Sequence, residues 1–457
     1  MYVDVLVAEI GSTTTVVNAF KDLDTEDPVF IGQGQAPTSV AAGDVNIGLS
    51  EAIESLKKAL GAESLEYREL MATSSAAGGL KMTVHGLVYD MTAKAAREAA
   101  LGAGANIHMV TAGRLRRSEI KKVQELNPNI ILVAGGVDYG EADTALYNAE
   151  VIAKLDLNVP VIYAGNIVNH EDVREIFEEH GKGNLLYIVE NVYPRIDTLN
   201  VEPTRKVIQD VFEEHIIHAP GMARVREMVK GHIIPTPGAV MEASKVLRQE
   251  IGDLMTLDVG GATTDIHSVT EGTEEVGKIL LAPEPTAKRT VEGDLGVYVN
   301  MTNVVEMIGL DRLAKDLELD AEQVQYLIDN HLPIPVEADQ KRFVERLTQE
   351  AVIVSSHRHA GGFRDLFGSS GKKKMAEGKD LTGIQFIVGT GGALTRLPNR
   401  VEILKRIAES NRGDKLLPNT ECMILIDNHY IMASLGVLSK EYPEAALRLM
   451  KKSLELI

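Results

Sequence analysis

The chain has 457 residues, of which 44% are hydrophobic and 25% charged, so we expect two or three folded units and no wholesale disorder. Asp and Glu number 66 against 47 Lys and Arg, which gives a formal net charge of −19. This charge argues against a nucleic-acid partner, because affinity for the phosphate backbone comes from clustered Lys and Arg. The longest basic run, Lys372–Lys374, predicts a solvated loop in the Gly/Ser-rich stretch 368–380.

The cysteine content and the N-terminus bear on the compartment. Cys422 is the single cysteine, which excludes an intramolecular disulfide and a cysteine-cluster metal site. The first residues, Met1–Val5, lack the basic leader of a secretory signal, and no apolar run approaches the ~20 residues of a membrane helix. We therefore expect a cytoplasmic protein with no membrane partner.

The N-terminal region reads as three strands followed by a helix. Tyr2–Ala8 and Thr15–Phe20 are apolar and β-branched and flank a tight turn at Gly11–Thr13. A third strand is expected at Val29–Gln33, and Asp44 caps an amphipathic helix that ends at Gly61. This order is typical of the opening of a mixed sheet.

From about residue 100 to 195 the pattern changes to regular strand and helix alternation. The expected strands are Ile107–Thr111, Ile130–Ala134, Val161–Ala164 and Leu185–Val189. Such alternation predicts an inserted parallel α/β domain. Its glycine-rich turn, Ala134–Gly140, lacks the GxGxxG spacing, so a tight structural turn is favoured over an anion site.

One sequence pattern occurs twice. Glu9–Thr15 and Asp258–Thr264 both read acid, aliphatic, Gly, small, small, Thr, Thr, and each stands between two strand-like runs. Their separation of about 250 residues is too long for a solenoid repeat and indicates a duplicated lobe.

The repeated pattern suits phosphate binding. Glycines let backbone N–H groups approach phosphate oxygens, hydroxyls add donors, and a carboxylate can hold hydrated Mg²⁺. A triphosphate held by two such turns receives donors and an acid from each lobe. A third glycine-rich element, Gly389–Gly392, follows an expected strand at Ile384–Val388 and could lie against a base or ribose.

Together these elements resemble the actin/Hsp70/sugar-kinase superfamily of ATPases. Asp258–Asp265 matches its second phosphate motif, Glu9–Thr14 resembles the first with Glu in place of Asp, and Gly389–Gly392 resembles the adenosine motif. Pro237–Val240 and Ala433–Gly436 resemble its two connecting motifs. The resemblance implies an α/β fold of duplicated actin-like (ribonuclease H-like) ATPase lobes with a nucleotide cleft and an inserted α/β domain.

The resemblance also implies a domain organisation. Lobe I would span residues 1–253 and contain the α/β insertion at about 100–195. Lobe II would span residues 254–430, and the C-terminal helices of residues 431–457 would return to lobe I.

The implied cofactors are ATP and Mg²⁺, and the motifs assign their contacts. Asp258 and Asp265 would hold hydrated Mg²⁺ or orient the attacking water, with Glu9 as a supporting acid. The nucleotide-binding residues would be Gly11, Ser12, Thr13, Thr14, Gly260, Gly261, Thr263, Gly389, Thr390, Gly391 and Gly392. Close helix packing at a hinge would involve Gly238, Ala239, Ala433 and Gly436.

Three sequence segments indicate one family within this superfamily: Ala8–Thr15, Thr73–Met82 and Val133–Asp138. They resemble the GlmL/MutL-type accessory proteins of coenzyme-B12-dependent aminomutases such as glutamate mutase, which are distinct from the mismatch-repair protein of similar name. The resemblance implies an ATP-dependent reactivase that binds an adenosylcobalamin-dependent mutase and promotes release of damaged cobalamin. The sequence leaves open which mutase is served and whether a small companion subunit is required.

Two other functions stay open at this point, because a fold alone does not fix function. A metabolite kinase of the same superfamily needs a general base beside an acceptor hydroxyl, for which Asp265 is a candidate. A nucleotide-gated scaffold or filament is the other alternative. For Thr73–Met82, a surface that lines the nucleotide cleft or contacts a partner and a purely structural turn are equally favoured. A metal site at His357 and His359 is disfavoured.

Overall fold

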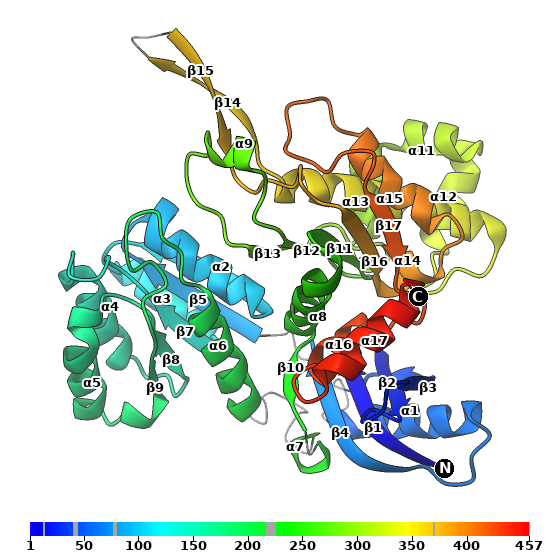
Figure 1. Ribbon diagram of the computed structural model, residues 1–457, viewed down its shortest axis with the longest axis horizontal. Coiled ribbons are helices and arrows are strands. Elements are labelled where there is room, and N and C mark those ends of the chain that lie inside the picture. Colours follow the sequence, from blue (N-terminus) through cyan, green and yellow to red (C-terminus); the bar gives the residue numbers. More distant parts are fainter. Residues whose placement is uncertain are drawn as a thin grey trace. The chain divides into compact units, whose positions relative to one another are not determined.

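The computed structural model in Figure 1 describes residues 1–11, 14–39, 44–75, 80–215, 225–229, 231–368 and 371–456. The chain divides into two compact units. Unit 1 consists of Met1–Ala243 and Ala433–Ala446, and unit 2 of Ser244–Met432 and Leu447–Ile457. The C-terminal residues are therefore shared between the units, whereas the sequence assigns all of 431–457 to lobe I.

The first sheet of unit 1 has the strand order β10-β4-β1-β2-β3. Its strands are β1 (Tyr2–Ile10), β2 (Thr14–Lys21), β3 (Val29–Pro37), β4 (Glu66–Ser74) and β10 (Ile233–Pro235). β1 pairs antiparallel with β2 and parallel with β4, β2 pairs antiparallel with β3, and β10 pairs parallel with β4. The three N-terminal strands are confirmed, and helix α1 (Asn46–Ala59) follows them as predicted.

The second sheet of unit 1 is wholly parallel, in the order β6-β5-β7-β8-β9. Its strands are β5 (Leu80–Gly86), β6 (Ala105–Ala112), β7 (Ile130–Val133), β8 (Val161–Tyr163) and β9 (Leu186–Ile188). All four strands predicted for the insertion are present. The sheet nevertheless begins at Leu80 and not near residue 100, because β5, in which Leu80, Met82 and Val84 alternate with polar residues, was not predicted as a strand.

Helices cover both faces of this parallel sheet. Its inner positions Ile130 and Leu132 pack with α2 (Lys94–Gly102) and α6 (Glu202–His215), whereas Ile131 and Val133 pack with the helices of the other face. Those helices are α3 (Arg117–Leu126), α4 (Asp143–Ala153) and α5 (His170–Glu179). The insertion is therefore a doubly wound α/β layer, as the alternating pattern predicts.

Unit 2 is built on a single five-stranded sheet in the order β13-β12-β11-β16-β17. Its strands are β11 (Leu254–Val259), β12 (Thr264–Val269), β13 (Ala287–Glu292), β16 (Phe386–Thr390) and β17 (Met423–Ile426). β11 pairs antiparallel with β12 and parallel with β16, β12 pairs antiparallel with β13, and β16 pairs parallel with β17.

This order and these directions repeat the first sheet of unit 1 strand for strand. In both, three antiparallel strands are followed by two parallel strands that add on the other side of the first strand. Two copies of this five-stranded arrangement, each with helical crossovers, constitute the duplicated actin-like, ribonuclease H-like fold that the sequence predicts.

The remaining elements complete the two units. Unit 1 also holds α7 (Val225–Met228), the start of α8 (Thr236–Ile251) and most of α16 (Met432–Leu438). Unit 2 also holds α10 (Met301–Ile308), α11 (Leu310–Leu317), α12 (Ala321–Asp329), α13 (Ala338–His359), α14 (Gly391–Arg396) and α15 (Arg400–Glu409). The short α9 (Glu274–Gly277) packs through Val276 with Ala376 and Leu416, in a cluster separate from the core of the sheet. Helix α17 (Pro443–Ser453) spans the unit boundary.

A two-stranded hairpin replaces the expected solvated loop at 368–380. Strands β14 (Gly362–Gly368) and β15 (Gly371–Glu377) form a separate antiparallel sheet that extends from unit 2 (Figure 1). Lys372–Lys374 are exposed, as predicted, but they lie in β15. Among the helices that the structure describes, none combines the length and apolar character that a membrane span requires.

Candidate functional site

The two copies of the repeated sequence pattern fold into equivalent hairpin turns. Gly11 N–H donates to the Thr14 carbonyl at 3.1 Å, and Gly260 N–H donates to the Thr263 carbonyl at 2.9 Å. A side chain at Gly11 would place its Cβ 2.7 Å from the Thr14 oxygen, so this position requires glycine. Ser12 and Thr13, which the sequence assigns to phosphate binding, lie outside the described residues.

In unit 2 the repeated turn joins a row of polar residues across neighbouring strands. Asp258 on β11 lies opposite Asp265 on β12 and opposite Thr390 on β16. Asp427 follows β17 directly, and its N–H donates to the Gly389 carbonyl at 2.9 Å. The structure thus brings together Asp258, Asp265, Thr263 and Thr390 from the predicted set, and adds Asp427.

Asp265 is held by an arginine that the sequence pattern does not reveal. Arg289 on β13 donates from Nε to Asp265 Oδ1 at 2.8 Å and from a terminal nitrogen to the same oxygen at 2.5 Å. Thr263 Oγ1 donates to the other oxygen at 3.1 Å. Arg289 is 1% exposed and Asp265 6%, so this is a buried ion pair that neutralises one acid of the row.

Asp258 has no such cation of its own. The pKa of Asp258 is raised to about 7, mainly by removal from water and further by the carboxylates of Asp265 and Asp427, which Arg289 only partly opposes. A carboxyl group with this pKa is half-ionised near neutral pH and can accept a proton or take up a cation. Perturbed acids of this kind concentrate at functional sites.

Asp427 organises the ends of two strands. Its Oδ2 accepts from Thr390 Oγ1 at 2.9 Å and from the N–H groups of Ile431 and Met432, both at 2.9 Å. Its Oδ1 accepts from Ser453 Oγ at 2.7 Å. Asp427 therefore caps the chain segment that enters α16 and fixes Thr390. An acid directly after the apolar run Met423–Ile426 was the signal in the sequence that could have indicated it.

The glycines of the third glycine-rich element, Gly389–Gly392, differ in how much space surrounds them. A Cβ at Gly391, where φ is +85°, would lie 2.4 Å from Asp258 Oδ1, so glycine is required for the acid to sit there. A Cβ at Gly392 would meet no atom within 4 Å. At Gly389 it would meet Leu404 Cδ1 at 2.8 Å, so Gly389 packs against α15, and its contact with adenosine stays a prediction.

The carbonyl groups of the 260–263 turn are all occupied. The Gly260 carbonyl accepts from Val297 N–H at 3.2 Å, and the Gly261 carbonyl accepts from the N–H groups of Tyr298 and Val299 at 2.9 and 2.7 Å. The Ala262 carbonyl accepts from Asn300 Nδ2 at 2.7 Å. The turn is thereby fixed with its electronegative oxygens against the 297–300 loop.

In unit 1 the acid of the first turn is bound to a helix. Glu9 is 7% exposed, and its Oε1 accepts from Ser434 N–H at 3.1 Å and from Ser434 Oγ at 2.6 Å. Asn18 Nδ2 donates to the same oxygen at 3.3 Å. Glu9 therefore caps the first turn of α16, a positioning role that the sequence did not indicate.

The predicted close packing of the connecting helices occurs within unit 1. A Cβ at Gly436 would lie 1.8 Å from the Ala239 carbonyl oxygen, so α16 and α8 approach with no room for a side chain. Gly238 lies against another segment, since a Cβ there would be 2.5 Å from the Ala103 oxygen. Ala433, also in the first turn of α16, is 7% exposed. A hinge at these residues stays a prediction.

We expect Gly436→Ala to destabilise the protein by about 2 kcal/mol, because the added methyl group must push α16 away from α8. Urea unfolding followed by circular dichroism measures the change. Gly277→Ala is the matched control, since a Cβ at Gly277 meets nothing within 4 Å. Equal stability of the two variants would contradict the close approach.

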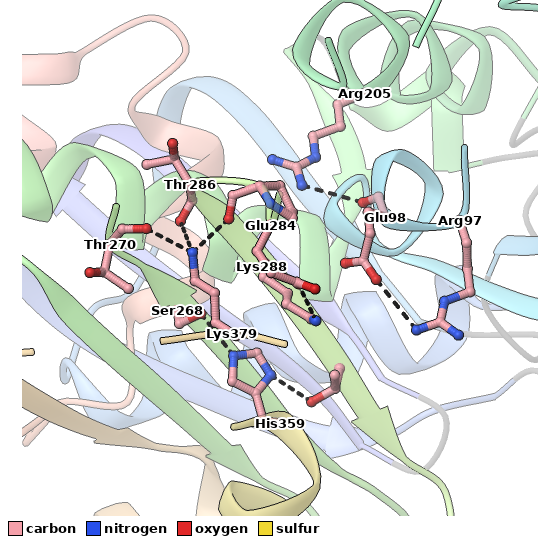
Figure 2. A network of polar contacts seen from close by, with 12 residues as sticks. Arg97, Glu98, Arg205, Ser268, Thr270, Glu284, Thr286, Lys288, His359 and Lys379 are labelled. Carbon is pink, nitrogen blue, oxygen red and sulfur yellow. Dashed lines mark hydrogen bonds and ion pairs between the residues drawn. The ribbon is translucent and has the colours of Figure 1, made fainter. Parts of the chain in front are cut away.

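His359 and His357, near the sheet of unit 2, have structural partners. His359 Nδ1 pairs with Thr290 Oγ1 at 2.9 Å and its Nε2 with Ser268 Oγ at 2.8 Å (Figure 2). His357 Nε2 pairs with Ser410 Oγ at 2.8 Å. Nearby, buried Lys379 donates to the carbonyls of Thr270, Pro285 and Thr286. Across the described ranges, no three His, Cys, Asp or Glu side chains are grouped as metal ligands.

Comparison with known proteins gives matches over the whole chain. A family model described as MutL protein matches residues 5–454. The protein MutL of Clostridium tetanomorphum is 35% identical over 462 residues, which covers 98% of this chain and 98% of that protein.

Two solved structures are similar at low identity. Nucleotide-free acetone carboxylase is 13% identical, over 96% of this chain and 70% of that chain, with a TM-score of 0.42. The diol dehydratase-reactivating factor in nucleotide-free form is 11% identical, over 96% of this chain and 99% of that chain, with a TM-score of 0.40. These values are too low to carry a functional conclusion.

The family match and the full-length relative agree with the motifs and with the duplicated fold. They confirm the resemblance seen in the sequence. The chain belongs to the MutL family.

Proposed function

We propose that this protein binds and hydrolyses Mg-ATP and serves as an accessory, reactivating chaperone of an adenosylcobalamin-dependent mutase. In this proposal ATP turnover promotes release of damaged cobalamin from the mutase. The observation that carries it is the duplicated hairpin turn, whose copy in unit 2 holds Asp258 beside Asp265 and Thr390 at the ends of three strands. Family membership supports the accessory role.

The phosphate contacts follow from the turn geometry. We propose that Gly260, Gly261 and Thr263 surround phosphate oxygens with the Gly261 N–H as the donor, because the Gly260 N–H closes the turn onto Thr263 and the Thr263 hydroxyl donates to Asp265. Gly11 and Thr14 of unit 1, with Ser12 and Thr13, are likewise proposed to bind phosphate oxygens of ATP. Gly391, Gly392 and Thr390 are proposed to face the adenosine.

The acids fit a Mg²⁺ ion that is bound mainly through the nucleotide. Mg²⁺ keeps several waters and is held by one or two carboxylates plus phosphates, so a cage of three protein ligands is not needed. Asp258 fits because burial, and after it the carboxylates of Asp265 and Asp427, raise its pKa, and a bound cation would stabilise its ionised form. When bound, Mg²⁺ would supply charge neutralisation to the phosphates.

The two aspartates then have different tasks. Asp258 is the acid available to the cation or to the attacking water, whereas Asp265 is paired with Arg289. We propose that Asp265 positions Thr263 and tunes Asp258 through its charge. Glu9 supports the site indirectly, by fixing the first turn of α16.

We propose that the γ-phosphate couples nucleotide turnover to the binding of a partner. Loss of the γ-phosphate removes contacts that order the surrounding segments, and such changes switch a partner surface between two states. A mutase with a spent cofactor is the partner that the family resemblance implies.

The test uses the purified full-length chain and a purified glutamate mutase loaded with an inactive cobalamin. We expect calorimetry to detect ATP binding only with Mg²⁺, slow phosphate release that the mutase stimulates, and ATP-dependent exchange of the inactive cobalamin. Absence of nucleotide binding to folded protein would overturn the whole proposal. A phosphorylated metabolite with little free phosphate would favour a kinase, and ATP-dependent light scattering would favour a filament.

A further inference from the structure

A cavity of about 490 Å³ lies in the inserted α/β domain of unit 1, far along the chain from the repeated turns. Its lining residues follow the carboxyl ends of β7, β8 and β9. Open, doubly wound parallel sheets bind ligands outside the carboxyl ends of their strands, and 490 Å³ is within the range of small-molecule sites. The strand order β6-β5-β7-β8-β9 is the 2-1-3-4-5 order of such sheets.

On one side of the cavity, the carboxylates of Asp138 and Glu190 are hydrogen-bond acceptors that neighbouring groups hold in place. Asp138 uses Oδ1 to accept from Asn191 Nδ2 at 2.9 Å and from Ile167 N–H at 3.1 Å. Glu190 uses Oε2 to accept from Asn200 Nδ2 at 3.0 Å. A carboxylate has two oxygens and about four lone-pair sites, so each acid is held in place with acceptor capacity to spare.

The other side carries basic groups on α5. Arg174 donates from one terminal nitrogen to Glu171 at 2.6 Å, which leaves most of the five N–H donors of a guanidinium. His170 Nε2 is buried and has no hydrogen-bond partner among the described residues. A buried imidazole nitrogen without a partner costs free energy unless a ligand or water completes it.

The remaining wall is apolar, and the loop above it is held in an unusual conformation. Ile188, Val189 and Pro194 line the cavity. In the adjoining turn, Tyr139 has a φ of +62° although it is not glycine, and the residue is 83% exposed. Asn166 Oδ1 accepts from Tyr139 N–H at 3.0 Å and holds this conformation. Strained residues of this kind concentrate at ligand sites.

We propose that this cavity binds a small zwitterion, a free α-amino acid, with its ammonium group on Asp138 and Glu190 and its carboxylate on Arg174. His170 completes the carboxylate site, and the apolar wall accepts the carbon chain.

The charges on the two sides decide the ligand class. The carboxylates of Asp138 and Glu190 would repel a phosphate. A simple amine could bind these carboxylates, but it carries no negative group to pair with Arg174. Burial lowers the pKa of His170, so the imidazole is neutral at pH 7 and Arg174 is the cation of this site. A ligand with one positive and one negative group matches both sides.

The inference is independent of the proposed function, because the cavity lies wholly in unit 1 and needs neither nucleotide nor mutase. Its test uses the nucleotide-free full-length chain and the twenty standard L-amino acids, first by thermal shift and then by calorimetry. We expect at least one amino acid to bind, and Asp138→Asn and Arg174→Gln each to weaken it by about tenfold or more. Lys121→Gln, on the exposed surface of α3, is the control and should bind like the unmodified chain.

A second readout does not depend on the folding of the variants. In the unmodified chain, saturation with the amino acid should raise the pKa of His170, followed by NMR of its ring protons and assigned with His170→Gln, because a carboxylate then lies beside the ring. Absence of amino-acid binding, equal binding of ribose or inorganic phosphate, or binding that survives both substitutions would each overturn the proposal.

Discussion

Asp258→Asn is expected to lower Mg-dependent ATP hydrolysis by about a hundredfold or more, the usual loss when an acid that serves the reacting phosphate is removed. The amide keeps the size of the side chain, so the close approach of Gly391 is retained. Phosphate release under saturating ATP measures the effect. Asp311→Asn on the exposed surface of α11 is the control and should keep full activity.

The same substitution should stabilise the nucleotide-free protein at alkaline pH. The Asp258 carboxyl titrates near 3.8 when unfolded and near 7 when folded, so the native state binds more protons between these values. Its contribution therefore becomes more unfavourable as the pH rises from about 4 to 7, by at most roughly 4 kcal/mol at full ionisation. Asp258→Asn should raise the melting temperature at pH 8 and leave it little changed at pH 4. Full activity of the variant, or lower stability at pH 8, would contradict the assigned role of Asp258.

Arg289→Met is expected to be the most destabilising substitution in unit 2, by about 3–5 kcal/mol, because it leaves the Asp265 carboxylate buried without its cation. Urea unfolding measures the loss. Arg289→Lys should recover part of it, since a lysine restores charge but not the two contacts from Nε and a terminal nitrogen to Asp265 Oδ1.

A double substitution separates the ion pair from simple packing. If the cost comes from an uncompensated charge, Arg289→Met combined with Asp265→Asn should be clearly more stable than Arg289→Met alone. An equally unstable double variant would assign the loss to the packing of the arginine stem and would contradict the electrostatic role.

The sequence predicted the elements whose signals are local. Apolar, β-branched runs bounded by glycine identified the strands on both sides of Gly11 and Gly260, and the repeat of this pattern identified the duplication. β4 was missed because the adjacent charges of Arg68 and Glu69 interrupt its alternation. β5 was missed although Leu80, Met82 and Val84 alternate regularly with polar residues.

The site could be predicted only where a motif is continuous in the chain. Asp258, Thr263 and Asp265 belong to one hairpin, so their proximity follows from the turn. Arg289 and Asp427 lie near Asp258 and Asp265 only because strands far apart in the sequence pair with one another. A single sequence does not show which strands become neighbours. The capping of α16 by Glu9 is hidden for the same reason, since Ser434 lies 425 residues further along the chain.

The pairing of β4 with β10 explains how the protein accommodates its large insertion. The two strands are parallel neighbours, Ile233 opposite Ala72 and Pro235 opposite Ser74, about 5 Å apart. Parallel neighbours always need a crossover connection, which in unit 2, between β16 and β17, consists of α14 and α15. In unit 1 the whole doubly wound domain occupies that connection. The length and content of this connection can therefore change without altering the register of the host sheet, since only its two ends are fixed by the pairing of β4 with β10.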